Sequence, residues 1–155
     1  MQTENNLSIS HLMIPDHRKC DELYAELEEV VVAKDWPQAE KLMIKFTDSM
    51  QKHLDAEEDL IFPEFEKKTG QTQGPTYVMK MEHQQMKDIM ERLTKILTED
   101  GSENAYDEVV GLMETLMILM QQHNMKEEQM LYIMADQVLA ESLETIVPEL
   151  SKKLQ

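Results

Sequence analysis

The sequence predicts an all-α protein: an up-down-up-down antiparallel four-helix bundle with a short C-terminal helix. Hydrophobic residues make up 41% of the 155-residue chain and charged residues 30%, and only four glycines and five prolines interrupt it. Such a composition is typical of a chain that is helical almost throughout. Apolar residues also recur at helical spacing in four long segments that turn-forming residues separate. Four long helices with short connections favour an antiparallel bundle.

The first half of the chain contains two of these segments. Pro15, followed by Asp16, can open the first helix, which should run to about Lys34. Asp35 can cap the second helix, which should reach about Phe65. One face of this second helix combines apolar side chains with a histidine and a glutamate: Leu42, Phe46, Met50, His53, Glu57, Leu60 and Ile61.

The second half begins after a loop from Gly70 to Pro75. A third helix is expected from about Thr76 to Thr98, where the turn-forming residues 99–102 end it. A fourth helix is expected from about Ala105 to Leu139. Its face has the same mixed character as that of the second helix: Leu112, Leu116, Leu119, His123, Glu127, Met130 and Met134. A short helix capped by Ser142 and interrupted near Pro148 should pack on the end of the bundle.

Length and charge restrict the class of protein. A chain of this size can bury one core, so residues 1–155 are expected to form a single domain with the bundle at about 11–140. The net charge of −16 disfavours nucleic acid as a partner, because a phosphate backbone would be repelled. The N-terminal segment lacks the features of a signal peptide, and no apolar run approaches the ~20 residues that span a bilayer. With the lone Cys20 unable to form an internal disulfide, we expect a cytoplasmic protein.

The second and fourth predicted helices contain a repeat. Residues 51–62 (QKHLDAEEDLIF) align with residues 121–132 (QQHNMKEEQMLY), and each copy reads Q-x-H-x-x-x-E-E-x, followed by two apolar residues and an aromatic one. The first and third helices each supply a histidine preceded by an acid, in Asp16-His17 and Glu82-His83. The chain therefore consists of two halves, each with one histidine followed by a second histidine that has a glutamate four residues later.

The spacing of these residues predicts a metal site. Residues i and i+4 lie on one helix face, so an imidazole and a carboxylate at that offset can point at the same ion. His17 and His53 each lie about 17 residues from the first turn, and His83 and His123 flank the turn near residue 100 in the same way, so all four can share one layer. The middle connection fits this layer only if Pro63 ends or kinks the second helix early.

Each motif taken alone is weak, because a single histidine on an apolar face is more often a hydrogen-bonded core residue than a ligand. Two copies in repeat register, with two further histidines at matching height, favour metal. Burying so many ionisable groups in one layer would be costly unless a cation compensates them. Mixed nitrogen and oxygen ligation suits redox-active iron, and manganese or zinc remain possible by ligand type. The candidate ligands are His17, His53, Glu57, His83, His123 and Glu127.

At these residues the chain resembles the hemerythrin-like, or HHE, family, over roughly residues 11–140. The resemblance implies two non-haem iron ions with an oxo or hydroxo bridge. One would be held by His17 and His53 and the other by His83 and His123, with Glu57 and Glu127 bridging them. The oxygen-carrying members have a second histidine on the third helix, where this chain has Met79 and Lys87, and an aspartate one residue beyond the position of Glu127. The four-His, two-Glu pattern is instead similar to that of iron–sulfur-cluster repair proteins and related iron or oxygen sensors.

The resemblance implies a protein that binds or senses O2 or NO, and two alternatives stay open. The same centre could act as an enzyme in cluster repair or in NO or peroxide reduction, or the bundle could be an iron-responsive interaction module. Ferritin-like chemistry is disfavoured because Met50 and Met120 stand where a Glu-x-x-His motif needs its glutamate. Cys20 is expected to be a buried inert thiol, and Tyr24 and Tyr132 to be core residues or hydrogen-bond donors to a bound ligand.

Overall fold

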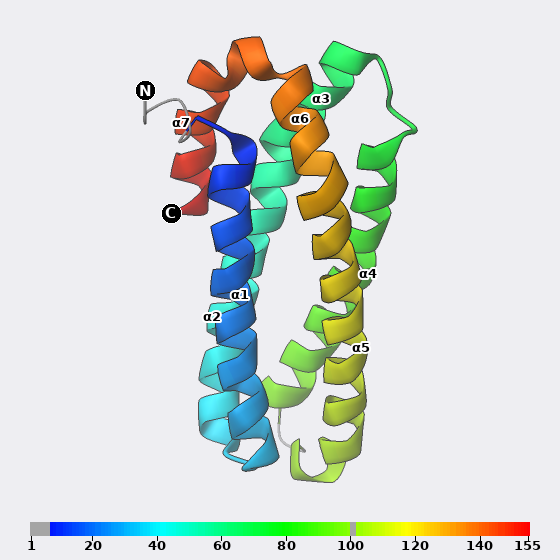
Figure 1. Ribbon diagram of the computed structural model, residues 1–155. Helices are drawn as coiled ribbons and strands as arrows, with labels where there is room; N and C mark the ends of the chain where they lie inside the picture. Colours follow the sequence, from blue (N-terminus) through cyan, green and yellow to red (C-terminus); the bar gives the residue numbers. More distant parts are fainter. Residues whose placement is uncertain (1–6, 100–101) are drawn as a thin grey trace.

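The computed structural model describes residues 7–99 and 102–155, and within these residues it is all-helical. Four long helical segments form an antiparallel bundle, and a short helix packs alongside α1 and α2 near one end (Figure 1). The predicted fold class is confirmed. The main helices are α1 (Ile9–Val32), α2 (Trp36–Ala56), α3 (Phe62–Thr69), α4 (Pro75–Thr98), α5 (Tyr106–Lys126), α6 (Tyr132–Val138) and α7 (Leu143–Leu154). Two π-helical turns, η2 (Glu57–Ile61) and η4 (Glu127–Leu131), join α2 to α3 and α5 to α6, and 3-10 turns cover Ser102–Ala105 and Ala140–Ser142.

The first helix starts earlier than the sequence indicated. Pro15 was expected to open it, but α1 begins at Ile9, and Pro15 lies inside the helix. The side chain of Ser8 caps it by accepting a hydrogen bond from the backbone N–H of His11 at 3.0 Å. The backbone N–H groups of Ile9 and Ser10 donate to the carboxylate of Asp136, at 2.6 and 3.2 Å. Ser8 is a local signal for this start, but the carboxylate of Asp136 comes from α6 and could not be inferred from the local sequence.

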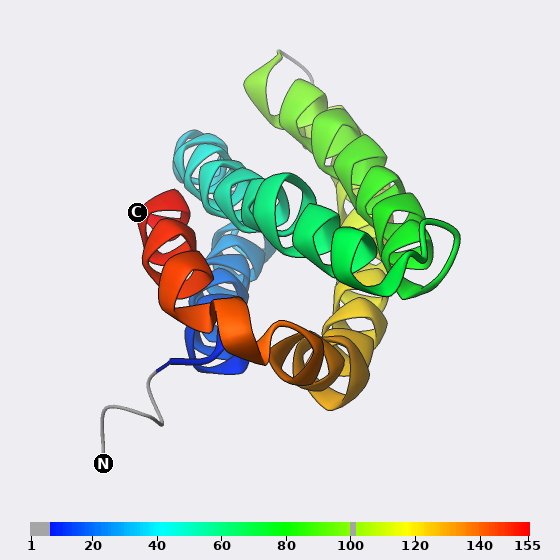
Figure 2. The ribbon, with the colours of Figure 1, turned by 90° about the horizontal axis from the view of Figure 1, so that it is seen from above.

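The second helical segment was expected to end or kink at Pro63; it does not end there, and its change of direction comes at η2, just before Pro63. It passes through the π-helical turn η2, and Pro63 is the second residue of α3, where a missing N–H costs little. Beyond η2, α3 leans toward α4 across the end of the bundle (Figures 1 and 2). The extra chain between His53 and Gly70 is thereby accommodated without displacing His53. Gly70, with a φ of 73°, ends α3 in the left-handed conformation that glycine favours.

The fourth segment contains the matching turn η4, and this changes its buried face. Met130 was expected on that face but is 61% exposed, whereas Leu131 is buried. A π-helical turn holds one residue more than an α-helical turn, so apolar positions after Glu127 shift by one. Leu112, Leu119 and Met134 are only partly buried, and the face before the turn comprises Val109, Met113, Leu116 and Met120.

The ends of the remaining helices follow the sequence less closely. The helix α7 is continuous through Pro148, and Ser142 precedes it without a side-chain capping bond. This helix packs against α1 and α2. Thr98 ends α4 as expected, while Asp100 and Gly101 of the expected turn lie outside the described residues. None of the described helices has the length and apolar character needed to cross a membrane.

The core consists of two apolar clusters with a polar layer between them. Cluster A includes Phe46, Leu93 and Leu116, and cluster B includes Phe62 and Phe65. Along every long segment of the bundle, residues of one cluster precede the candidate ligands and residues of the other follow them. The polar layer is therefore enclosed by hydrocarbon on both sides.

Asp136 ties the start of α1 to α6, so its removal should destabilise the protein. We expect Asp136→Ala to lower the free energy of unfolding by about 1–3 kcal/mol, because three donors at the start of α1 lose one shared acceptor. Urea unfolding monitored by circular dichroism measures this change. Glu22→Ala, at an exposed position of α1, is the control and should leave the midpoint nearly unchanged. Equal midpoints for both variants would contradict this role of Asp136.

Candidate metal centre

The polar layer contains four histidines and two glutamates that are all at most 2% exposed. They come from α1, α2, η2, α4, α5 and η4: His17, His53, Glu57, His83, His123 and Glu127. The rings of His17 and His53 are 4.6 Å apart between centroids, and those of His83 and His123 are 4.9 Å apart. The sequence-predicted residues are thus brought together in one layer, as their spacing indicated.

These residues form two groups that share both glutamates. The first group is His17, His53, Glu57 and Glu127, and the second is His83, His123, Glu57 and Glu127. Within each group, one potential ligand atom from each residue lies within 4.8 Å of all the others. Each group therefore matches one of the two donor sets that the resemblance implied.

Each glutamate directs one oxygen to each group. Glu127 Oε1 lies 3.0 Å from His17 Nε2, and its Oε2 lies 3.2 Å from His123 Nε2. Glu57 Oε2 lies 3.7 Å from His53 Nε2, and its Oε1 lies 3.0 Å from His83 Nε2. This is the arrangement that two carboxylates need in order to bridge two cations.

A carboxylate orients each imidazole from outside the layer. In the first group, the Nδ1 of His17 lies 2.8 Å from Glu128 and that of His53 lies 2.7 Å from Asp16. In the second group, the Nδ1 of His83 lies 2.5 Å from Glu58 and that of His123 lies 2.7 Å from Glu82. An ionised carboxylate only accepts, so each Nδ1–H donates, and in the neutral ring the Nε2 lone pair faces the centre of the layer. Carboxylate–histidine–metal arrangements of this kind fix the tautomer and orientation of metal-binding histidines.

We call these four acids the outer carboxylates. They belong to the sequence motifs but are not among the candidate metal ligands, and their bonds to the histidines show their structural role. Asp16 and Glu82 are the acids that precede His17 and His83, yet each bonds the other histidine of its own half. Glu58 and Glu128 are the second glutamates of the two E-E pairs, and each bonds a histidine on a different helix. The acids were visible as part of the pattern, but only the packing of the helices shows what each one contacts.

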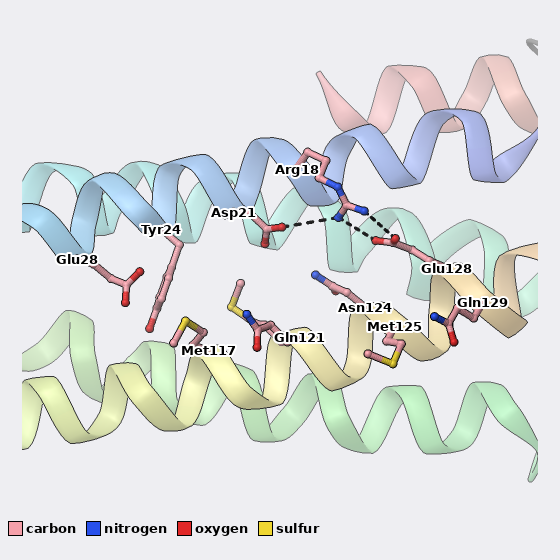
Figure 3. Close-up of a pocket in the computed structure, with 11 residues that line it drawn as sticks. Arg18, Asp21, Tyr24, Glu28, Met117, Gln121, Asn124, Met125, Glu128 and Gln129 are labelled. Atoms are coloured by element: carbon pink, nitrogen blue, oxygen red, sulfur yellow. Dashed lines mark hydrogen bonds and ion pairs between the residues drawn. The ribbon is translucent and has the colours of Figure 1, made fainter.

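Basic side chains hold three of the outer carboxylates from the solvent side. Arg18 binds Glu128 through two nitrogens, at 2.9 and 3.1 Å, Lys126 binds Glu82, and Lys87 lies 3.7 Å from Glu58. A cleft of about 500 Å³ between α1 and α5 lies beside the first of these pairs (Figure 3). Because Glu128 both lines this cleft and bonds His17, it separates the cleft from the buried layer.

The layer favours protons where no cation is bound. Burial alone would lower the pKa of His83, but the carboxylates of Glu57 and Glu58 raise it to about 9. Burial likewise opposes protonation of His53 and His123, and neighbouring glutamates again raise both pKa values. Burial and the nearby Glu127 raise the pKa of Glu57, whereas contacts with Glu57 and the histidines hold the pKa of Glu127 well below its ordinary value despite burial. The negative field of the carboxylates thus attracts positive charge to the layer.

The donor atoms of the second group also suit a cation. Its four inward atoms are buried: Glu57 Oε1, Glu127 Oε2, His83 Nε2 and His123 Nε2. They approach one another to 3.0 Å (His83–Glu57) and 3.2 Å (His123–Glu127). With neutral imidazoles and ionised carboxylates all four are acceptors, so these contacts leave them unsatisfied. Buried polar atoms without partners are rare and costly. A cation between these atoms would satisfy all four, and their nitrogen and oxygen donors suit a first-row transition metal.

Tyr132, which the sequence left open as a core residue or a hydrogen-bond donor to a bound ligand, is a further residue of the layer. It is five residues after Glu127, and the π-helical turn η4 brings its hydroxyl within 3.0 Å of Glu127 Oε1 and 2.7 Å of Glu57 Oε2. Phe62 holds the repeat-equivalent position and stacks on His83, with centroids 5.6 Å apart. The final aromatic of each motif copy was visible in the sequence, but the π-helical turns that direct it inward were not.

The other residues singled out in the sequence lie outside the layer. Burial raises the pKa of the Cys20 thiol to about 11, and its sulfur lies 3.5 Å from Ser49 Oγ, as suits an inert core thiol. The hydroxyl of Tyr24 donates to the carbonyl of Met113. Met79 is buried one turn before His83, whereas Lys87 reaches the outer carboxylate of Glu58.

Comparison with known protein families gives one match. The family described as the hemerythrin HHE cation-binding domain matches residues 8–135. No curated protein and no solved structure matches the chain. The match covers most of the described bundle, including all six residues of the two groups.

The outer carboxylates should control metal affinity without being ligands. We expect Asp16→Ala and Glu82→Ala to weaken metal binding by about 10–100-fold, because His53 and His123 lose the bonds that orient them. Competition with a chromophoric chelator measures the affinity. Asp21→Ala is the matched control, since Asp21 is one turn from His17 but pairs with Arg18. An affinity that falls equally in all three variants would contradict this assignment.

The metal-free protein should lose stability as the pH rises. The raised pKa of His83 means that its contribution is fully present below the unfolded value of 6.5 and disappears as the pH passes about 9. We expect the melting temperature in the presence of chelator to fall across this window, and the stabilisation by added metal to grow, because deprotonated ligands bind metal. Differential scanning calorimetry from pH 6 to about 9.5 follows both. A chelated protein with a constant melting temperature would contradict the prediction.

Proposed function

The chain belongs to the hemerythrin HHE cation-binding domain family, and we propose that its buried layer holds two non-haem iron ions. The observation that carries this proposal is that both glutamates place one oxygen beside each histidine pair. The proposed ligands are the six buried residues of the layer: His17, His53, Glu57, His83, His123 and Glu127.

Iron is the proposed metal because of the donors and their number. Two imidazole nitrogens and two carboxylate oxygens per ion suit iron, and they leave coordination positions open. The two bridging carboxylates offset part of the charge of two Fe2+ ions, and an oxo or hydroxo bridge, which the family resemblance implies, would offset more. A centre of this kind supplies redox-active binding of a small exogenous ligand.

We propose O2 or NO as that ligand, in a binding or sensing role. All six proposed ligands are at most 2% exposed, and clusters A and B enclose the layer with hydrocarbon. A small, weakly polar diatomic molecule can diffuse through such packing, whereas an organic substrate would require the core to open. The outer carboxylates keep the imidazoles in place while the ligand comes and goes. We further propose a cytoplasmic location, where the free thiol of Cys20 would stay reduced.

The stoichiometry of iron tests the proposed centre. Protein reconstituted anaerobically should hold two irons per chain, and Glu57→Ala and Glu127→Ala should each lose at least one, because each removes a bridge. Iron is measured by inductively coupled plasma spectrometry after desalting. Glu144→Ala, on the exposed side of α7, is the control and should retain both irons. Retention of two irons in both bridge variants would rule out the bridging role.

The optical spectrum tests the proposed ligand. The reduced, iron-loaded protein should change its spectrum on addition of air or NO, and the spectrum should return when the gas is removed. A change that does not reverse and that is accompanied by continuous consumption of NO or peroxide would favour the enzymatic alternative. No change with either gas would contradict the binding and sensing role.

A further inference from the structure

The hydroxyl of Tyr132 lies among the donor atoms of the first group. Its oxygen is 3.1 Å from His17 Nε2, 3.3 Å from His53 Nε2, 2.7 Å from Glu57 Oε2 and 3.0 Å from Glu127 Oε1. These are the four atoms that the first group directs inward. The residue itself is completely buried.

Ordinary hydrogen bonding accounts for this position only while extra protons occupy the layer, and no longer does so once the ligands are deprotonated to bind metal. A phenol has one proton to donate. The imidazoles of His17 and His53 already donate from Nδ1 to Glu128 and Asp16, so in their neutral form they present acceptors at Nε2. With the glutamates ionised, as metal binding requires, four acceptors converge on one donor hydrogen, and a single hydroxyl can satisfy only part of them.

The distances are those expected between ligands on one metal ion. In an octahedral shell, bonds of about 2.1 Å at right angles place neighbouring donors about 3.0 Å apart. The four distances from the Tyr132 oxygen, 2.7 to 3.3 Å, bracket this value. Its oxygen therefore occupies a corner of the same coordination shell rather than the centre of it.

The backbone and the ring both hold the phenol in this place. The π-helical turn η4 directs the side chain of Tyr132 inward from α6. The Tyr132 ring stacks against the ring of His17, with the centroids 5.6 Å apart and an angle of 28° between the planes. In the other half, η2 directs Phe62 onto His83 with nearly the same geometry, 5.6 Å and 23°. Phe62 has no oxygen, so the four inward atoms of the second group, all acceptors when the imidazoles are neutral, have no hydroxyl beside them.

We propose that Tyr132 is a ligand of the metal ion in the first group, so that the two ions have different donor sets. The inference rests on the two-iron centre proposed above and adds a residue to it. The phenol would bind as phenolate, releasing its proton to solvent, and hard anionic oxygen favours ferric iron. The ion in the second group then has one protein donor fewer, so exogenous ligands are directed to the His83 and His123 side.

The test is the visible spectrum of the oxidised, iron-loaded protein. Phenolate bound to Fe3+ produces an intense charge-transfer band, and resonance Raman excitation within that band enhances the ring modes of the coordinated tyrosine. We expect both signals in the unmodified protein. Tyr132→Phe should lose both while retaining two irons, and Tyr24→Phe, which removes another buried hydroxyl, should keep both.

The outcomes separate this inference from the proposed centre. Fewer than two irons in the unmodified protein would overturn the two-iron centre itself. Two irons without phenolate modes, or a band that persists in Tyr132→Phe, would overturn ligation by Tyr132 and leave the centre standing. If Tyr132→Phe does not fold, the Raman spectrum of the unmodified protein decides the question, because it requires no variant.

Discussion

The convergence of six ionisable side chains on one buried layer is the constraint on which the rest of the structure depends. Isolated charges in such a place would cost several kcal/mol each, so every element around the layer serves to position or neutralise them. The outer carboxylates orient the imidazoles, and Arg18, Lys87 and Lys126 bind those carboxylates at the surface. Clusters A and B exclude water above and below. A cation would complete this arrangement, since the four inward atoms of the second group are all acceptors when the imidazoles are neutral and have no donor among the described residues.

The two π-helical turns solve a geometric problem that a regular α-helix would leave open. Each starts at a glutamate of the layer and ends just before an aromatic residue, Phe62 or Tyr132. An extra residue in the turn lets the glutamate and the residue five positions later both face inward, which the 3.6-residue period does not allow. The turn also shifts the apolar face, so that Leu131 is buried where Met130 was expected. Single π-helical turns are frequent at functional sites, and here both coincide with the layer.

The internal repeat makes the halves of the site similar but not identical. Both supply two histidines and a glutamate in the same arrangement, and both histidine pairs bond outer carboxylates. They differ in the aromatic that faces the layer and in the cation that holds the outer glutamate, which is Arg18 in one half and Lys87 in the other. Arginine can bind a carboxylate through two nitrogens, whereas lysine binds as a point charge. The two groups of candidate ligands are consequently unequal in surroundings even though their histidines and glutamates match.

The sequence by itself determined the fold class, the number of long helical segments, the repeat and the six residues that share the layer. These follow from spacing along one chain, because the helical period assigns residues to faces and equal distances from a turn place them at equal heights. Tertiary structure decided what depends on residues far apart in the chain. Asp136 on α6 sets the start of α1, ahead of Pro15, and the helix packing decides which acid orients which histidine. Tertiary packing also determined where the π-helical turns form. Burying both Glu127 and Tyr132 in the layer requires a local backbone that intrinsic helix propensity does not favour.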